Sequence, residues 1–328
     1  MSDLRKTGLF LRGLLAQEIK PPEMLVDQLL YQNTITMISA DPGTGKSTVA
    51  LNLACAVSSG QRVFGKLEVA QPNPVYYLAF ETLFEEFQMV IAAMAGHGET
   101  PVVLNCENFW WDDGLLGLNV LDVRQVDALL KRIEAWQAPK LIIIDPLYMV
   151  VLGGLSEDKT GSAVAQFLLR LRRTFGAALL VLHHTKRQQH DKDGRPVGDT
   201  NPFYGSRWLD AVLHTNYHLK KRDDQHSGVT LEVKKDRLKA CLPKLTLQYH
   251  AETMTCTLEE SSGELPKRLF SLLAAYKLKG KVETDFYEVQ TAMGCSQRQL
   301  ARLVKLEALK QLVFLESRPG QRTCWRLK

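Results

Sequence analysis

Short apolar segments alternate with segments of helical periodicity between residues 34 and 260. Apolar segments rich in β-branched residues predict strands at Thr34–Ser39, Val75–Phe80, Val102–Cys106, Lys140–Asp145, Ala177–His183, Leu213–Leu219 and Val229–Lys234. Apolar residues at three- and four-residue spacing predict helices at Lys46–Ser58, Glu85–Ala95, Val123–Trp136 and Ser162–Phe175. This alternation is typical of an α/β domain with a mainly parallel sheet and helices on both faces. Two further strands, Leu245–Tyr249 and Thr255–Leu258, follow without helices, so the sheet is expected to end in antiparallel hairpins.

The pattern changes after Gly263 to three short helices and a hairpin. These elements are expected at Glu264–Leu278, Glu283–Met293, Ser296–Leu309, Val313–Ser317 and Thr323–Leu327. They outline a winged helix-turn-helix, which usually places its third helix in the major groove of DNA. The exposed face of that helix carries Arg298, Arg302 and Lys305, which are candidate DNA contacts; docking of another protein is the alternative. We therefore expect three parts: a helical lead-in at 1–30, the α/β domain at 31–260, and the winged helix at 264–328.

Composition excludes several classes of protein. Hydrophobic residues make up 45% and charged residues 23% of the 328, as in soluble globular proteins. No apolar run reaches the ~18 residues of a membrane span, and the six cysteines form no CxxC pair, so we expect a cytoplasmic protein without a membrane segment, a disulfide framework or a zinc ribbon. The net charge of +5 is unevenly spread, because residues 264–328 hold 13 Lys or Arg against 6 Asp or Glu. A basic module of this kind suits a polyanion, although a solvated surface is the alternative.

The segment Ile38–Val49, ISADPGTGKSTV, lies directly between a predicted strand and a predicted helix. A phosphate loop needs this arrangement, because consecutive N–H groups and the helix N-terminus hold a phosphate. Lys46 is expected to reach the β- and γ-phosphates and Ser47 to bind Mg²⁺. Ala40 replaces the usual first glycine, but it is small enough for the tight turn. The sequence therefore predicts a nucleoside triphosphate site formed by Asp41, Pro42, Gly43, Thr44, Gly45, Lys46, Ser47 and Thr48.

Acidic residues end two of the predicted strands. The segment KLIIID brings Asp145 to the carboxyl edge of the sheet, where parallel sheets bind ligands, so we expect Asp145 to bind Mg²⁺ with Ser47. In AAA+ ATPases the glutamate that activates water normally follows this aspartate directly. Here Pro146 follows Asp145, so that carboxylate must come from elsewhere in the chain. Glu81, at the end of VYYLAFE, is the candidate general base.

These residues resemble the RecA/DnaB superfamily of P-loop ATPases, and within it the RepA-like hexameric replicative helicases of plasmids and phages. The resemblance rests on Lys46, Glu81 and Asp145 in this chain order and covers roughly residues 20–258, not the winged helix. It implies a RecA-like core, with ATP and Mg²⁺ as ligands. The expected partners are single-stranded or forked DNA, other copies of the chain in a hexameric ring, and replication proteins bound through the winged helix.

The resemblance also suggests roles for the segment LLVLHHTK and the loop after it. His184 takes the position of a residue that senses the γ-phosphate. A zinc site shared with His183 is not expected, because adjacent residues on a strand point to opposite faces. The following long loop would line the channel of a ring, where basic side chains can track a nucleic-acid backbone. Its candidate DNA contacts are Lys186, Arg187, Lys192 and Arg195.

Family members also carry a lysine and an arginine, two residues apart, that reach the γ-phosphate of a neighbouring subunit. Lys235 and Arg237 have this spacing, and Arg207 is a second candidate for the arginine finger. The N-terminal segment LFLRGLLAQEI has a helical pattern, and it packs either on an adjacent protomer or on its own domain.

The sequence thus predicts an ATP-dependent motor on DNA, in its most specific form a helicase. One alternative is a DNA-binding ATPase switch, such as a helicase loader, a recombination mediator or a replication-initiation factor, which the winged helix favours. The separation of Glu81 from Asp145 argues against the AAA+ form of such a switch. A second alternative is a regulatory RecA-fold ATPase whose C-terminal module docks protein.

Overall fold

The computed structural model divides the chain into two compact units, Met1–Leu258 and Glu259–Lys328, and each is described by itself. The residues that the structure describes are 23–96, 105, 107–114, 117–151, 158–185, 189–190, 196–197, 207–222, 228–238, 241–259, 269, 272, 283–285, 288–289, 292, 313–316 and 324–327. Within these residues, no helix combines the length and the hydrophobicity that a membrane crossing requires.

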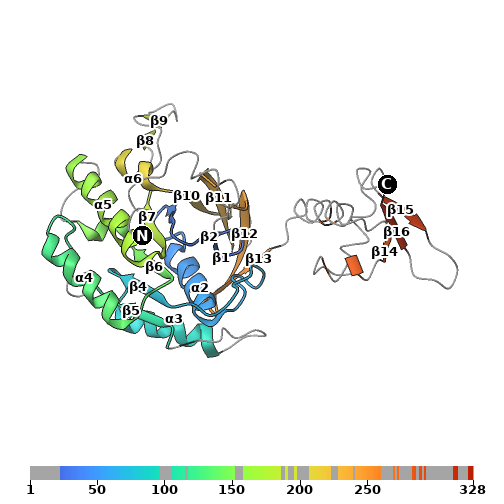
Figure 1. Cartoon of the computed structure of the whole chain (residues 1–328), viewed down its shortest axis with the longest axis horizontal. Helices are drawn as coiled ribbons and strands as arrows, with labels where there is room; N and C mark the ends of the chain where they lie inside the picture. Colours follow the sequence, from blue (N-terminus) through green and yellow to red (C-terminus); the bar gives the residue numbers. More distant parts are fainter. Residues whose placement is uncertain are drawn as a thin grey trace, which may run out of the picture. The chain divides into compact units, whose positions relative to one another are not determined.

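A nine-stranded sheet forms the centre of the first unit (Figure 1). Its strands lie in the order β13-β12-β11-β10-β3-β7-β6-β4-β5. Their bounds are β3 Ile35–Ala40, β4 Val75–Ala79, β5 Phe109–Asp112, β6 Leu141–Asp145, β7 Ala178–His184, β10 Thr215–Lys221, β11 Gly228–Asp236, β12 Lys244–His250 and β13 Thr255–Leu258. In this spatial order, the neighbouring strands β10, β3, β7, β6, β4 and β5 pair in parallel. The neighbours β10, β11, β12 and β13 pair antiparallel, so the predicted terminal hairpins are confirmed.

Helices cover both faces of this sheet. Helices α2 (Lys46–Ser59) and α3 (Phe84–Gly96) pack on one face. The other face carries α4 (Val123–Trp136), α5 (Asp158–Phe175) and α6 (Arg207–Val212); α4 and α5 are drawn in green at the left of Figure 1.

Side chains alternate between the two faces along each strand. In β6, Leu141 and Ile143 join the core under α2, whereas Ile142 and Ile144 join the core under α4 and α5. The same period of two places Asp145, the next residue of the first series, on the α2 face. The fold is therefore the predicted α/β fold, with the carboxyl ends of its central strands at the start of α2.

Smaller elements complete the two units. A two-stranded sheet joins β1 (Met24–Val26) to β2 (Leu30–Tyr31), and a second joins β8 (Gln189–His190) to β9 (Pro196–Val197). A short 3₁₀ helix, η2 (Leu147–Val150), follows β6. The second unit contains a sheet in the order β14-β16-β15, formed by β14 Glu283–Asp285, β15 Val313–Glu316 and β16 Cys324–Leu327.

Two predicted elements differ from the structure. Residues 283–285 form strand β14, which pairs with β16, so the helix predicted for Glu283–Met293 does not start at Glu283. Cross-strand hydrogen bonds here outweigh the local helical periodicity. The strand predicted at Val102–Cys106 lies largely outside the described residues, and Asn105 is not in a strand. The edge strand is instead Phe109–Asp112, which pairs with β4. The two strands predicted near the C-terminus are confirmed as β15 and β16.

Candidate active site

The phosphate loop connects β3 to α2. Gly43 and Gly45 have φ angles of 70° and 97°, in the left-handed region that glycine adopts without steric cost. Gly45 is the N-cap of α2 and provides no side-chain cap, so the first backbone N–H groups of the helix are suited to an anion. The hydroxyl of Thr44 donates to the carbonyl of Asp41 at 2.7 Å and holds the turn closed. The loop thus has the geometry that phosphate binding needs.

Lys46 is buried in this loop, with 6% of its surface exposed. Its Nζ atom contacts the carbonyls of Ala40 at 3.2 Å and Asp41 at 3.1 Å, and Nδ1 of His184 at 3.2 Å. An ammonium group has three protons and no acceptor, so Nδ1 of His184 accepts and the ring carries its proton on Nε2. Burial lowers the pKa of Lys46, although nearby carboxylates, first that of Asp145, oppose this.

Asp145 ends β6 and is 5% exposed. Its Oδ2 atom accepts a hydrogen bond from the hydroxyl of Tyr77 at 2.7 Å, and its carboxylate also accepts one from the hydroxyl of Ser47. Burial raises the pKa of Asp145, while these two hydrogen bonds and the charge of Lys46 lower it. Sequence reasoning missed Tyr77, although the strand period places it on the same face as Asp145.

The oxygens of Ser47 and Asp145 fit a Mg²⁺ site. They lie within hydrogen-bond reach of each other, directly beside the ammonium group that would meet the same phosphates. The described residues contain no cluster of three or more His, Cys, Asp or Glu that would hold a metal by themselves. Mg²⁺ in nucleotide sites is typically bound by one or two protein oxygens, with phosphates and waters as its other ligands.

Glu81 lies just beyond the end of β4, and it is exposed. Ala79 of that strand pairs with Asp145, so the chain places Glu81 at the same sheet edge. Partial desolvation of its carboxyl and the charge of Asp145 raise the pKa of Glu81, and the charge of Lys46 opposes them. A carboxylate with a raised pKa is a stronger base than an ordinary glutamate.

The two histidines of β7 point to opposite faces, as the strand period predicts. His184 is half-buried on the α2 face, where its ring also contacts that of Tyr148 at 5.5 Å between centroids. Burial and the charge of Lys46 lower the pKa of His184, which favours the neutral ring. His183 is 1% exposed, and burial, His184 and Lys46 lower its pKa to about 4.

Thr185 connects the end of β7 to the phosphate loop. Its hydroxyl donates to Oδ1 of Asp41, and its backbone N–H donates to the carbonyl of Ala40 at 3.1 Å. With the contact between Lys46 and His184, three bonds join His184 and Thr185 to the end of β3 and the phosphate loop. Sequence reasoning missed Thr185, and the order of the strands is the signal that would have found it.

Lys235 and Arg237 lie beside the amino end of β3, whereas Lys46 follows the carboxyl end of that strand. Asp236, between them, pairs with Thr215, which in turn pairs with Thr36 at the start of β3. The phosphate loop begins after the other end of β3, about 13 Å away at ~3.3 Å per residue. Any contact between these two side chains and a γ-phosphate therefore requires a second protomer.

In this chain Lys235 and Arg237 bind α6 instead. Nζ of Lys235 forms an ion pair with Oδ2 of Asp210 at 3.0 Å, and Arg237 donates to the carbonyl of Ala211. Helix α6 begins at Arg207, whose side chain lies outside the described residues.

A cavity of about 410 Å³ adjoins the phosphate loop. Its volume is in the range of small-molecule sites. One wall comes from the loop and the first turn of α2, and the others come from β10 to β13. The lining residues are Gly43, Thr44, Gly45, Thr48, Val49, Lys221, Arg222, Gly228, Val229, Tyr249 and Cys256. The cavity thus continues the phosphate site toward the antiparallel half of the sheet.

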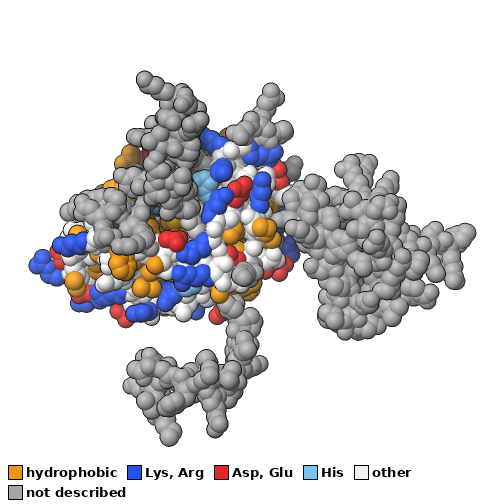
Figure 2. Space-filling view, turned by 90° about the horizontal axis from the view of Figure 1, so that it is seen from above, with side chains coloured by type: hydrophobic (Ala, Val, Ile, Leu, Met, Phe, Trp, Pro, Cys, Tyr) orange, Lys and Arg blue, Asp and Glu red, His pale blue; other side chains and the backbone are white. Residues whose placement is uncertain are grey.

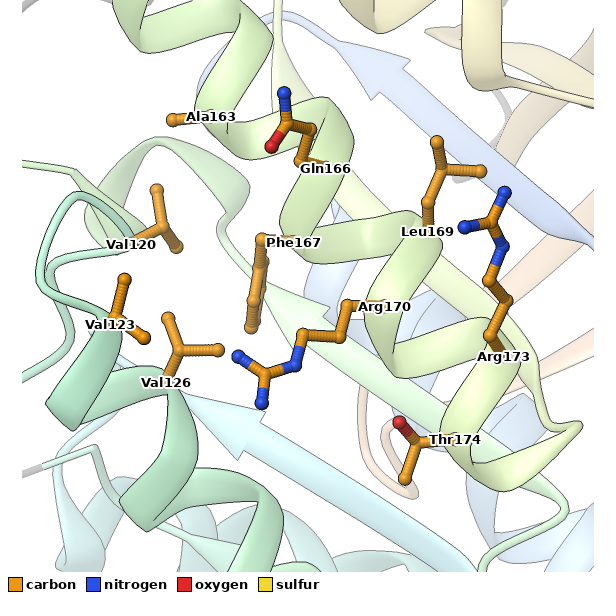
Figure 3. A pocket seen from close by; sticks show the side chains of 10 residues that line it. All are labelled: Val120, Val123, Val126, Ala163, Gln166, Phe167, Leu169, Arg170, Arg173 and Thr174. Atoms are coloured by element: carbon orange, nitrogen blue, oxygen red, sulfur yellow. The ribbon is translucent and has the colours of Figure 1, made fainter.

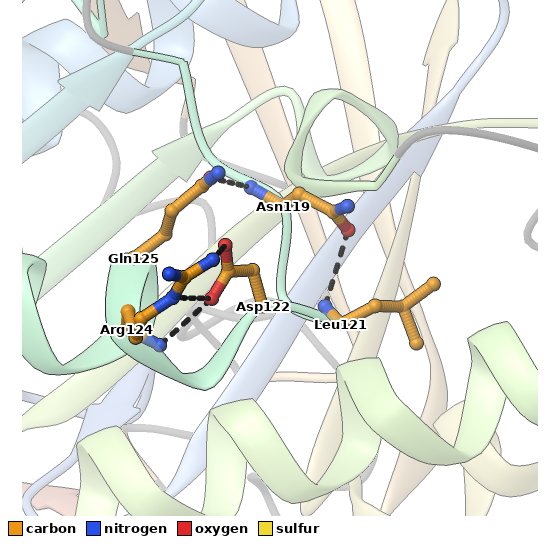
Figure 4. Close-up of polar contacts among 5 residues, drawn as sticks. All are labelled: Asn119, Leu121, Asp122, Arg124 and Gln125. Atoms are coloured by element: carbon orange, nitrogen blue, oxygen red, sulfur yellow. Dashed lines mark hydrogen bonds and ion pairs between the residues drawn. The ribbon is translucent and has the colours of Figure 1, made fainter.

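A larger cavity of about 600 Å³ lies on the other face of the sheet, between α4 and α5 (Figure 3). Val123 and Val126 face Phe167 across it, and the side chain of Arg170 extends from α5 toward Val126. The adjoining start of α4 is capped by Asp122, whose side chain accepts from the N–H of Arg124 at 3.0 Å (Figure 4). This groove is remote from the phosphate loop, so its size does not make it the nucleotide site.

The DNA contacts predicted for the segment after Thr185 and for the helix expected at Ser296–Leu309 lie outside the described residues. They are Lys186, Arg187, Lys192, Arg195, Arg298, Arg302 and Lys305. On the face seen in Figure 2, the Lys and Arg side chains lie among hydrophobic and acidic ones. The described side chains on this face therefore add no separate argument for a DNA site.

The fold and the site define a P-loop ATPase of the RecA-like class. A family model described as an AAA domain matches residues 4–190, which is more than half of the chain. The chain belongs to this AAA-domain family. No curated protein matches the sequence.

Two solved structures are similar to the chain at low sequence identity. A DnaB-like replicative helicase, solved for its interactions with primase, is 14% identical with a TM-score of 0.54, over 75% of this chain and 66% of that one. A KaiC-like protein from the hyperthermophilic archaeon Pyrococcus horikoshii is 13% identical with a TM-score of 0.48, over 74% of this chain and 99% of that one. At such identities the likeness to the helicase concerns the fold alone.

Proposed function

We propose that the chain hydrolyses ATP with Mg²⁺ and uses the reaction to move on DNA, most specifically as a ring-forming replicative-type helicase of the plasmid or phage kind. The observation that carries the hydrolytic part is the convergence of Lys46, Glu81, Asp145 and His184 on one edge of the sheet. The likeness of the fold to a DnaB-like replicative helicase supports the choice of a motor over other ATPases.

The phosphates of ATP would bind the N–H groups at the start of α2 and the ammonium group of Lys46. In the described conformation that group already has three acceptors, two carbonyls and Nδ1 of His184. A phosphate oxygen must therefore share or replace at least one of them. His184 is a side chain and moves more easily than the loop carbonyls, so nucleotide binding is expected to change its contact first.

Ser47 and Asp145 would hold Mg²⁺, which supplies neutralisation of phosphate charge when bound. Glu81, beside both Lys46 and Asp145, would orient a water molecule toward the γ-phosphate and accept its proton. The pKa of Glu81 is raised toward the working pH, which makes its carboxylate a stronger base. The cavity lined by Tyr249 and Cys256 would receive the ribose and the base.

Assembly would bring the remaining charges to the site. Lys235 and Arg237 cannot reach the phosphate loop of their own chain, but a head-to-tail neighbour could accept them. Each would give up its contact with α6, which carries Arg207 as the second candidate finger. Repeating this contact around an axis closes a ring, and a hexamer is the proposed form.

Two segments would bind DNA. The loop beginning at Lys186 follows Thr185, which is bonded to the phosphate loop, so changes at the γ-phosphate would be passed to it directly. The module at 264–328, proposed as a winged helix, would contact the forked or single-stranded DNA or a replication protein.

A strand-displacement assay on a forked duplex tests this proposal. Wild type with ATP and Mg²⁺ should release the displaced strand, and Lys46→Ala should not. Hydrolysis stimulated by DNA without displacement would favour the ATPase switch. DNA affinity that hardly changes with salt would favour the regulatory, protein-docking alternative, because phosphate contacts make affinity fall steeply with salt.

A further inference from the structure

Asn52 connects two walls of the cavity that adjoins the phosphate loop. It lies on α2, one turn after Thr48, and only 6% of its surface is exposed. One wall is formed by this first turn of α2, and the opposite one by the hairpin of β12 and β13. Asn52 itself is not among the residues that line the cavity.

Both polar atoms of the Asn52 side chain form hydrogen bonds, and two of these three bonds reach the hairpin. Nδ2 donates to the carbonyl of Thr48 at 2.8 Å and to that of Met254 at 3.0 Å. Oδ1 accepts from the backbone N–H of Cys256 at 2.8 Å. The two contacts with the hairpin join residues about two hundred positions away in the sequence to the helix that begins at the phosphate loop.

The bonded part of the hairpin is the part that lines the cavity. Cys256 pairs directly with Tyr249 across the two strands, and both residues line the cavity. Strand β13 is the edge of the sheet and pairs only with β12 among the described strands. The bonds from Asn52 to Met254 and Cys256 therefore hold the start of this edge strand, whose last residue, Leu258, donates to the carbonyl of Phe64 at 3.0 Å.

We propose that Asn52 positions the wall of the nucleoside pocket, and thereby sets the affinity for the nucleoside part of the nucleotide and not for its phosphates. This inference rests on the proposed function, in which the cavity receives the ribose and base. Asn52 touches no nucleotide in this account; it acts through Tyr249 and Cys256. An aspartate cannot replace it, because a carboxylate oxygen would face the carbonyls of Thr48 and Met254 where the amide donates.

The test compares a ligand that has a nucleoside with one that has only the phosphates. Dissociation constants with Mg²⁺ are measured calorimetrically for ATP and for inorganic tripolyphosphate, which carries the phosphates alone. The variants are Asn52→Ala and Asn52→Asp. Asn73→Ala is the matched control, because Asn73 is equally buried (7% exposed) and bonds to the carbonyl of Gln71, away from the cavity. Thermal melting of each variant verifies folding.

Both Asn52 variants should bind ATP at least about tenfold more weakly, since buried backbone groups lose their partners and the wall moves. Their affinity for tripolyphosphate, and the hydrolysis rate at saturating ATP, should stay within about twofold of wild type. Asn73→Ala should leave both affinities unchanged. Equal losses for the two ligands, or no loss for ATP, would overturn the inference. Should Asn52→Ala fail to fold, the isosteric Asn52→Asp decides by the same comparison. Wild type that binds neither ligand would instead refute the proposed nucleotide site.

Discussion

Nδ1 of His184 lies 3.2 Å from Nζ of Lys46, so the end of β7 is in direct contact with the lysine of the phosphate loop. We expect a γ-phosphate that approaches Lys46 to compete with His184 for the same ammonium group. In the proposed sensor role, His184 would pass the state of the nucleotide to β7 and, through Thr185, to the segment that begins at Lys186.

Replacing His184 with Ala should uncouple hydrolysis from DNA. Lys46 keeps its two carbonyl acceptors, so the affinity for ATP should remain within a few-fold of wild type. The stimulation of ATP hydrolysis by single-stranded DNA should be lost. Steady-state hydrolysis with and without DNA measures this. His250→Ala is the control, because His250 is exposed and its ring contacts the hydroxyl of Thr257, on the antiparallel edge of the sheet. Loss of ATP binding in His184→Ala would contradict the sensor role.

Tyr77→Phe should raise the Mg²⁺ concentration needed for half-maximal hydrolysis. The change removes a hydrogen bond that favours the ionised form of buried Asp145, so the pKa of that carboxyl should rise further and its oxygens should bind Mg²⁺ less well. The effect should be larger at pH 6 than at pH 8.

The adjacent Tyr76 provides a matched control for this change. It is equally buried, and its hydroxyl donates to Oδ2 of Asp112 at 2.6 Å on the opposite face of the sheet. Tyr76→Phe and Tyr77→Phe should each lower the free energy of unfolding by about 1 kcal/mol. Only Tyr77→Phe should change the Mg²⁺ dependence, and an equal change in both would refute the link to the metal site.

Protonation of the buried His183 should lower the free energy of unfolding in mild acid. Its pKa is about 4 in the folded chain, against 6.5 when unfolded, so the unfolded chain binds the extra proton first as the pH falls. Stability is then lost between pH 6.5 and about 4, by on the order of 3 kcal/mol. Denaturant unfolding of wild type and His183→Gln across this range measures it. The variant should show a shallower loss; identical slopes would contradict the assignment. The pKa of His214 is also lowered to about 4, so the stability of both wild type and His183→Gln should still fall somewhat over this pH range.

The position of Arg237 predicts complementation between inactive variants. Arg237→Ala leaves each phosphate loop intact, and Lys46→Ala leaves each arginine intact. Alone, each should hydrolyse ATP orders of magnitude more slowly than wild type. A mixture of the two should recover hydrolysis, because a site formed by one protomer of each kind has all its residues. Wild-type activity in Arg237→Ala, or a mixture as inactive as its components while still oligomeric by mass, would show that Arg237 does not act in a second protomer.

Sequence reasoning located the parts of the site that have a local pattern. The phosphate-loop motif marks Lys46, and Glu81 and Asp145 stand at the ends of predicted strands, where parallel sheets bind ligands. The contacts of Tyr77, Thr185 and Asn52 join residues separated by 68, 144 and 204 positions, and they have no local signature. The start of the helix predicted at Glu283 failed for the same reason, since pairing with β16 is a long-range interaction.

Glu81→Gln tests the central claim most directly. Glutamine keeps the size of the side chain but cannot accept a proton from water, so ATP should bind with wild-type affinity in the presence of Mg²⁺. The rate of hydrolysis in a single turnover should fall at least about a hundredfold. Hydrolysis by Glu81→Gln at the wild-type rate would contradict the assignment of the catalytic base, and with it the account of this sheet edge as the active site.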